Sequence, residues 1–288
     1  MKQVFLAFAA AVILAAGCCR TSAPSEKEVG FEEALGIPEC VIGAVPDSLG
    51  LDSWYSKYVD VNGIPLCASW RCPDSAMVAA HNTLWAMTSM LSDEIMDAMR
   101  RVGTRVTIMG RYEGTTDVPE HRFLSQDTTL NWDLRARGLG GDMTLPLTSC
   151  AEENVLAYQI DKYHAEDILI HEFAHTIHLV GIMQCEPDID DRLQALLDNA
   201  VEKDLWYNTY RLTDVAEYFA EGVQDWFNVN AEMDHPDGKH NYVNTREELQ
   251  ERDPGLYELL SQYFPATDLQ ISRHKKINLC TKENSRVK

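Results

Sequence analysis

The stretch that decides the fold is DILIHEFAHTIHLV, residues 167–180. Apolar side chains occur almost all round a helix drawn through it, so we predict a buried helix that ends at Gly181. Within this helix His171 and His175 are four residues apart and share one face. Two imidazoles placed in this way can bind one zinc ion, and Glu172 then lies beside the ion, where it can act as a general base toward water.

Burial makes this pattern specific. Two histidines and a glutamate inside an otherwise apolar helix need partners for their polar atoms, and a metal ion supplies them. The alternative, two hydrogen-bonded core histidines with an incidental glutamate, explains less of the pattern. The segment therefore predicts a zinc site, with Zn²⁺ as the cofactor.

A second helix, expected over residues 213–227, offers the third protein ligand that zinc enzymes require. Glu217, Glu221 and Gln224 line one of its faces, beside an apolar arc. A carboxylate stripe that borders a core suits a metal ligand and a residue that supports it, whereas a solvated acidic face is the alternative. We predict Glu217 as the ligand and Glu221 as a group that holds a zinc-bound histidine through its ring N–H.

Two other residues compete for the third ligand position. His178 follows His175 by three residues and is too crowded to bind the same ion, so we expect it to form a hydrogen bond close to the site. Glu186 falls in an expected loop. A metzincin would have glycine at position 178 and histidine at position 181, but this chain has His178 and Gly181, which excludes that class.

The HEFAH segment together with YRLTDVAEYFAE, residues 210–221, resembles the catalytic domain of anthrax lethal factor and related gluzincin peptidases. In that family a glutamate-bearing helix follows the HExxH helix, and a tyrosine lies seven residues before the ligand glutamate. The resemblance implies Glu217 as the ligand, Glu221 as its supporting residue and Tyr210 as the residue that stabilises the oxyanion. It covers about residues 165–228, so it implies the catalytic centre and leaves the substrate open.

The chemistry of a phenol gives a separate reason to consider a tyrosine. A phenol near the metal can donate a hydrogen bond to the oxyanion of a tetrahedral intermediate. Tyr210 is the favoured residue, and Tyr207 and Tyr163 are its rivals.

The rest of the chain predicts an α+β, zincin-like fold in which a twisted sheet packs on the buried active-site helix. Periodicity predicts one helix over residues 75–101, a strand at 105–109 and terminal helices over 248–262 that break near Pro254. Residues 143–148 would form an edge strand, because Pro146 cannot donate to a ladder. Such an edge could bind an extended peptide by strand addition.

Residues 1–17 predict an export signal, because a basic residue precedes an apolar run, residues 4–16, that is too short to span a membrane. The small residues before Cys18 suit either signal cleavage or lipidation of Cys18, which would anchor the protein to a membrane. Residues 18–39 then form a tether and residues 40–288 a single zincin-like catalytic domain. We expect the protein to be secreted, periplasmic or lipid-anchored.

Export implies an oxidising compartment, where disulfides persist. Outside the signal region there are six cysteines, an even number that fits up to three disulfides with the pairing left open. They are Cys40, Cys67, Cys72, Cys150, Cys185 and Cys280. No C-x-x-C pair occurs among them, which argues against a cysteine zinc site.

The formal net charge of −20 opposes binding to nucleic acid and to anionic membranes. It would suit basic substrates, although a solvated acidic surface is the favoured explanation. We expect a peptide or protein substrate, cleaved by a zinc endopeptidase with Glu172 as general base. Two alternatives stay open: a zinc amidase acting on non-peptide or cell-wall material, and a non-catalytic surface binding protein that contains zinc. The oligomeric state is not predicted.

Overall fold

The computed structural model describes residues 35–163 and 165–269. The predicted export signal at 1–17, Cys18, the tether up to residue 34 and Cys280 lie outside these residues. Among the helices of the described part, none is both long and apolar enough to cross a membrane.

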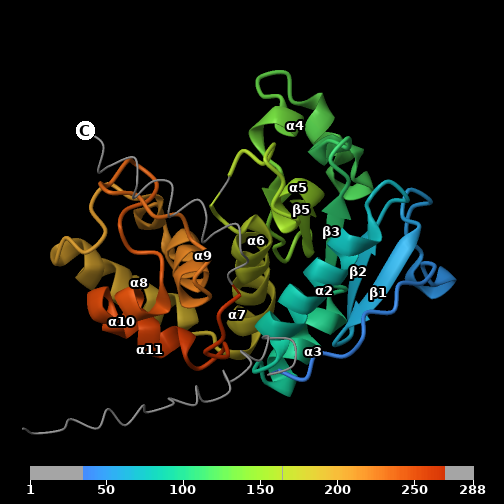
Figure 1. The fold of residues 1–288 in the computed structure, drawn as a ribbon. Helices are drawn as coiled ribbons and strands as arrows, with labels where there is room; N and C mark the ends of the chain where they lie inside the picture. The colour runs from blue at the N-terminus through green and yellow to red at the C-terminus, as the bar shows by residue number, and fades with distance from the viewer. Residues whose placement is uncertain (1–34, 164, 270–288) are drawn as a thin grey trace, which may run out of the picture.

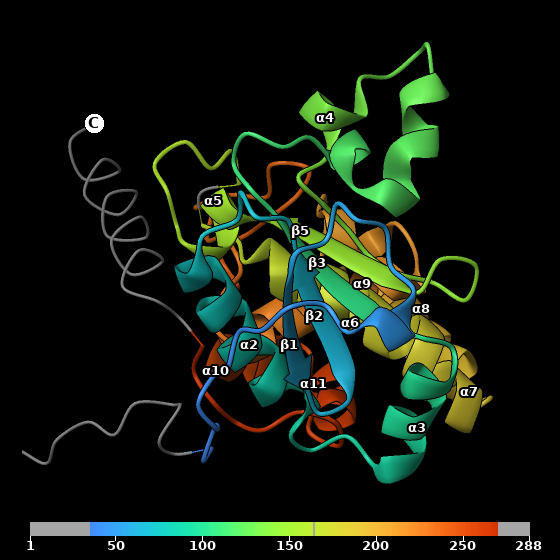
Figure 2. The same cartoon turned by 90° about the vertical axis from the view of Figure 1, so that its right-hand side faces the viewer.

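A five-stranded mixed sheet forms one layer of the molecule (Figures 1 and 2), with the strand order β1-β2-β3-β5-β4. The strands are β1 (Lys57–Val61), β2 (Ile64–Ala68), β3 (Arg105–Met109), β4 (Gly138–Leu139) and β5 (Leu147–Ala151). The β1–β2 pair is antiparallel, β2, β3 and β5 are parallel, and β4 is antiparallel to β5. The fold is therefore α+β, compatible with the zincin-like class, and the predicted strand at 105–109 is confirmed.

The β1–β2 hairpin closes through Asn62 and Gly63, which both have positive φ angles, 52° and 80°. An Asn-Gly pair between two strands is the strongest short-range hairpin signal, because both residues tolerate this backbone conformation. Gly63 is also packed closely, since an added Cβ would lie 2.6 Å from Nε of Arg100.

Ten α-helices are present in the described residues. They are α2 (Asp74–Thr88), α3 (Asp93–Arg101), α4 (Trp132–Arg135), α5 (Glu152–Val155), α6 (Ile168–Thr176), α7 (Met183–Cys185), α8 (Ile189–Glu202), α9 (Val215–Trp226), α10 (Arg246–Arg252) and α11 (Pro254–Leu260). Helix α6 occupies the centre of the molecule, between the sheet and the group formed by α8 to α11 (Figure 1). It contacts β5 and α2 on one side and α9 on the other.

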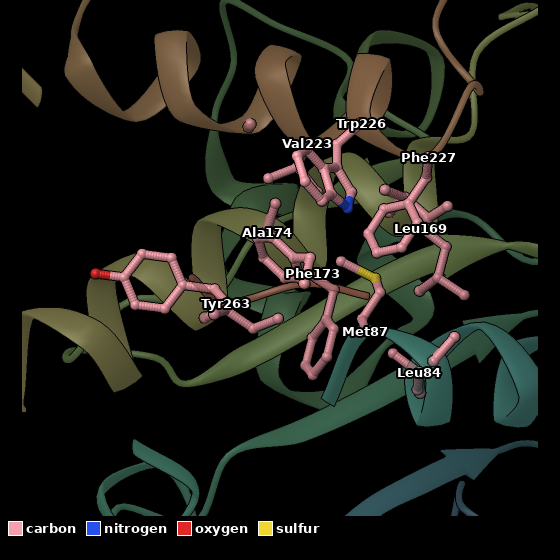
Figure 3. Packing of buried hydrophobic residues seen from close by; sticks show 14 of the residues in the cluster. Leu84, Met87, Leu169, Phe173, Ala174, Val223, Trp226, Phe227 and Tyr263 are labelled. Atoms are coloured by element: carbon pink, nitrogen blue, oxygen red, sulfur yellow. The ribbon is translucent and has the colours of Figure 1, made fainter. Parts of the chain in front are cut away.

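The core forms where α6 meets its neighbours (Figure 3). Leu169 and Phe173 of α6, Met87 of α2 and Phe227 just after α9 belong to one buried hydrophobic cluster. Phe173 and Phe227 are completely buried. Packing on two sides explains why the α6 sequence is apolar almost all round.

The single helix predicted over residues 75–101 is wrong, because two helices, α2 and α3, cover this stretch. Ser92 separates them: its side chain accepts a hydrogen bond from the backbone N–H of Ile95 at 3.3 Å, which is a helix N-cap. The apolar spacing continues across the break, so periodicity alone did not reveal it.

Gly181 does not end the helix of the HEFAH segment as predicted. The chain continues from α6 through a π-helical segment, Ile177–Ile182, into α7. A Cβ on Gly181 would lie 2.9 Å from Cγ2 of Ile95. Gly181 therefore allows α3 to pack closely against this segment, and it does not end the helix.

The predicted edge strand at 143–148 is also wrong. The strand begins at Leu147, just after Pro146, and lies between β3 and β4 in the sheet. The edge is instead the two-residue strand β4. The predicted break of the terminal helices near Pro254 is confirmed, since α10 ends at Arg252 and α11 begins at Pro254.

The disulfide prediction is wrong for the cysteines that the structure describes. Cys40, Cys67, Cys72, Cys150 and Cys185 are all free. Three of them are buried in the core, and burial raises the thiol pKa, to about 12 for both Cys67 and Cys72. They behave there as small apolar side chains.

Candidate metal centre

The two histidines of the HEFAH segment lie on α6 with their rings together. Asp167 begins this helix: its side chain accepts a hydrogen bond from the backbone N–H of Ile170 at 3.0 Å. Nε2 of His171 and Nε2 of His175 are 3.1 Å apart. Two ligands of a tetrahedral zinc ion lie roughly 3.3 Å apart, given metal–nitrogen distances near 2.0–2.1 Å. The rings are thus already spaced for a shared ion.

Glu217 comes from α9, which packs directly against α6. Asp214 begins α9 by accepting hydrogen bonds from the backbone N–H groups of Ala216 and Glu217. These hydrogen bonds fix the backbone of Glu217 in the first turn of α9, and its side chain extends from there toward the two histidines. Its Oε2 lies 3.2 Å from Nε2 of His171 and 3.6 Å from Nε2 of His175. The ligand atoms of the three residues all lie within 4.8 Å of one another.

Gln224 lies further along α9 than Glu217 and orients His171. Nδ1 of His171 lies 3.0 Å from Oε1 of Gln224. The amide orientation is fixed because Nε2 of Gln224 donates to the backbone carbonyl of Asp167 at 3.1 Å. Nδ1 therefore carries the proton and donates it, so that Nε2 presents its lone pair to the site. Glu221, which we predicted for this role, does not hold His171.

The electrostatics of the site call for a cation. Burial lowers the pKa of His171, but the close carboxylate of Glu217 and the charges of Glu172 and Glu221 outweigh this and raise it to about 10. Burial raises the pKa of Glu217, but its contacts with His171 and His175 lower it far below the ordinary value. The raised pKa of His171 reflects the carboxylates around its ring, and the lowered pKa of Glu217 reflects attraction to positive charge at the two imidazoles. A cation held between these groups, either a proton or a metal ion, is therefore favoured.

The donor set fits zinc. Oε2 of Glu217 is buried and has no hydrogen bond of acceptable geometry, although two Nε2 atoms lie close to it. A buried carboxylate oxygen without a hydrogen bond is costly, and a metal ion would satisfy it. Two imidazole nitrogens and one carboxylate oxygen are a ligand set typical of catalytic zinc.

Glu172 lines the same cavity as the three candidate ligands. The loop after β4 passes closely over it: a Cβ on Gly140 would lie 3.2 Å from Oε2 of Glu172 and 2.9 Å from Cβ of His175. The next glycine ties this loop to the helix, since the backbone N–H of Gly141 donates to Oγ1 of Thr176 at 2.8 Å. The side chain of Glu172 is thus confined beside the imidazoles.

Tyr210 lies at the rim of this cavity, in the short 3₁₀ turn Tyr210–Leu212 before α9. Its hydroxyl donates to Oε1 of Glu217 at 3.2 Å. Burial and the charge of Glu217 raise its pKa to about 12, so the phenol keeps its proton for donation. Of its rivals, Tyr207 is 65% exposed and does not line the cavity. Tyr163 lines it, but its hydroxyl accepts from the backbone N–H of Arg137 at 3.2 Å.

The remaining candidates do not belong to the cluster of three ligand atoms. Nε2 of His178 is 2.8 Å from Oδ1 of Asp190 on α8, so this ring ties α8 to the active-site helix. Glu186 is bonded to Arg192 and does not line the cavity. Glu221 lines the cavity, and its Oε2 accepts from Nδ2 of Asn230 at 3.0 Å.

Several cavity residues were missed by the sequence reasoning. Trp132 and Arg135 come from α4, and Lys239 and His240 from the loop between α9 and α10. Nε2 of His240 lies 2.9 Å from Oε1 of Glu166. The only sequence signal for these residues is their residue type, because neither segment has a periodic pattern.

Comparison with known proteins gives limited help. No family model matches the chain, and no curated protein matches it. Among solved structures, the Pro-Pro endopeptidase PPEP-2 from Paenibacillus alvei is similar, with a TM-score of 0.46 and 18% sequence identity. The match covers 69% of this chain and 97% of that chain. The function of this protein therefore has to be inferred from its own side chains.

Proposed function

We propose that this protein is a zinc-dependent endopeptidase. The observation that carries the proposal is the convergence of His171, His175 and Glu217 at one point of a cavity that Glu172 and Tyr210 also line. The same cavity thus contains a metal ligand set, a general base and a hydrogen-bond donor for an oxyanion, which are the parts that amide hydrolysis needs.

Each residue has a separate task in this proposal. Zinc, when bound by the three ligands, would supply Lewis acidity toward the scissile carbonyl and lower the pKa of water. Glu172 accepts a proton from the attacking water and later delivers it to the leaving amine. Tyr210 donates its hydroxyl proton in a hydrogen bond to the developing oxyanion. Gln224 keeps the ring of His171 in the tautomer that leaves Nε2 free.

The edge of the sheet supports a peptide as the substrate. Strand β4 lines the cavity and pairs with β5 along only one of its sides. Its other side can pair with an extended peptide by strand addition, which would place a backbone carbonyl over the ligand atoms. A Cβ on Gly138 would lie 2.5 Å from Cγ2 of Ile168, so this glycine lets the edge run close to α6.

The test uses purified protein loaded with zinc and a diverse peptide library, with products read by mass spectrometry. We expect cleavage by the wild type and a loss of about a hundredfold or more in the Glu172→Gln variant. Full activity in that variant would exclude Glu172 as the base. Absence of cleavage together with release of fragments from cell-wall material would favour the amidase.

A second measurement concerns the metal alone. We expect the wild type to bind one zinc ion by elemental analysis, and Glu217→Ala to lose it. Glu258→Ala, at an exposed carboxylate that does not line the cavity, is the control and should keep the metal. Zinc bound without any turnover would favour the binding-protein alternative.

We also propose that residues 1–17 direct export and that Cys18 is a lipidation site. Mass spectrometry of the mature N-terminus after expression in a bacterium would test this. A mature chain that begins at a lipid-modified Cys18 is the expected result, and an unprocessed Met1 would contradict export.

A further inference from the structure

The cavity has two cations at its rim that the proposed hydrolysis does not use. Arg135, the last residue of α4, and Lys239, in the loop before α10, both line the cavity and are exposed. Neither side chain forms an ion pair with any residue in the part of the chain that the structure describes. This is unusual in a chain with a formal net charge of −20, where carboxylates outnumber cations.

The carboxylates of the same cavity, by contrast, are already engaged. Glu217 contacts the two imidazoles, Glu166 pairs with His240 at 2.9 Å and Glu221 accepts from Asn230 at 3.0 Å. Glu172 is the proposed base. No acidic group of the cavity is therefore left to neutralise the two cations, and a ligand has access to both.

Backbone carbonyls tie Lys239 to Tyr210 and Arg135 to Lys162. The carbonyl of Lys239 accepts a hydrogen bond from the backbone N–H of Tyr210 at 2.8 Å. The carbonyl of Arg135 accepts from Nζ of Lys162 at 2.9 Å. The charge of Arg135 acts on the phenol of Tyr210, and the charges of both Arg135 and Lys239 act on Lys162. Both cations thus line the same cavity as Tyr210, and Lys239 is held next to it by the backbone hydrogen bond.

We propose that Arg135 and Lys239 form a subsite for a carboxylate side chain, so that the preferred substrates have aspartate or glutamate close to the cleaved bond. This inference rests on the proposed peptidase function. A guanidinium can bind a carboxylate through two parallel hydrogen bonds, and a flexible ammonium adds a second charge. Trp132 lines the same wall and can cover the methylene groups of the bound residue. The acidic net charge of the chain would by itself favour basic substrates, so the subsite opposes that expectation.

The test measures binding as well as cleavage, because binding needs no turnover. Acetylated peptide pools are made in pairs that differ only in glutamate or glutamine at one fixed position. Their affinity for the zinc-loaded Glu172→Gln variant is measured by calorimetry or by competition with a fluorescent peptide. We expect the glutamate pool to bind about fivefold more tightly at one position, and the difference to shrink as salt screens the charges.

Charge variants assign the effect to residues. Arg135→Gln and Lys239→Gln, each placed in the Glu172→Gln background, should reduce the preference for glutamate, and the double variant should remove it. Lys203→Gln is the matched control, because Lys203 is an exposed lysine that does not line the cavity. The double charge reversal, Arg135→Glu with Lys239→Glu, should invert the preference, so that the glutamine pool binds more tightly than the glutamate pool.

The cleavage pattern then separates the two proposals. If the wild type cuts the library with no enrichment of acidic residues and the glutamate and glutamine pools bind equally, the subsite is excluded and the peptidase stands. If nothing is cut but the glutamate pool binds through Arg135 and Lys239, the subsite stands and the peptidase fails. A preference that survives the double variant would also overturn the assignment.

Discussion

Nδ1 of His171 lies 3.0 Å from Oε1 of Gln224, so an amide on α9 sets the orientation of a ring on α6. Replacing the amide with an apolar group should weaken zinc binding, because the ring would lose both its orientation and its preferred tautomer. We expect Gln224→Leu to lower the zinc affinity about 10- to 100-fold, measured by competition with a chromophoric chelator.

The conservative variant serves as the control for this prediction. Gln224→Glu keeps an acceptor for the Nδ1–H group and should bind zinc more tightly than Gln224→Leu. An equal loss in both variants would mean that Gln224 acts only through packing.

Removing the hydroxyl of Tyr210 should slow turnover without releasing the metal. The hydroxyl bonds Glu217 at the cavity rim and is placed to donate to an oxyanion. We expect Tyr210→Phe to reduce kcat about 10²- to 10³-fold with little change in KM or in zinc content. Tyr207→Phe removes a hydroxyl from a tyrosine that is 65% exposed, and it should leave kcat unchanged. A similar loss in both variants would contradict the assignment.

The loop after β4 should not tolerate a side chain at Gly140. An added Cβ would lie 2.9 Å from Cβ of His175 and 3.0 Å from the carbonyl oxygen of Glu172. We expect Gly140→Ala to lower the free energy of unfolding by about 1–3 kcal/mol, measured by urea denaturation. Gly43→Ala is the control, because a Cβ there would have nothing within 4 Å. Equal stability of the two variants would mean that the loop moves without cost.

The pair of His240 and Glu166 should make stability depend on pH. Burial lowers the pKa of His240, but the carboxylate of Glu166, with Glu221 and Asp237 at longer range, raises it above the ordinary value. The folded protein therefore holds this proton more tightly than the unfolded chain. The stabilisation is fully present below the unfolded pKa of about 6.5 and is lost as pH rises through the folded value.

The measurement compares the Tm of the wild type with that of His240→Gln in a chelator, so that metal binding does not contribute. We expect the difference in Tm to be larger at about pH 5.5 than at about pH 8.5. A His235→Gln variant, at an exposed histidine, controls for the general effect of removing an imidazole. A difference that stays constant or grows with pH would contradict the prediction.

Local pattern predicted the elements that carry the site. The buried helix around HEFAH and the helix around Glu217 both follow from strong periodicity. The prediction that Glu217 lies close to His171 came from the ligand requirement of zinc and from a family resemblance. Periodicity does not indicate which helices pack against each other. The role of Glu217 as a ligand stays a prediction until metal binding is measured.

The parts that were missed depend on how elements are arranged. Gln224 was recognised on the same face as Glu217, but its bond to His171 depends on how α9 is rotated against α6. The strand at 143–148 was assigned to an edge because of Pro146, whereas its place in the interior is a property of strand order. Arg135 and Lys239 lie in a four-residue helix and an irregular loop, where no periodicity marks a functional residue.

The three proposed ligands come from two halves of the molecule. His171 and His175 belong to the helix that supports the sheet, and Glu217 belongs to the helix that contacts α8, α10 and α11. A zinc ion bound by all three would act as a cross-link between these halves, and its binding free energy would add to the stability of the folded state. The lifetime of the protein among other proteases would then follow the zinc concentration of its surroundings, so that a shortage of metal would remove the enzyme as well as its activity.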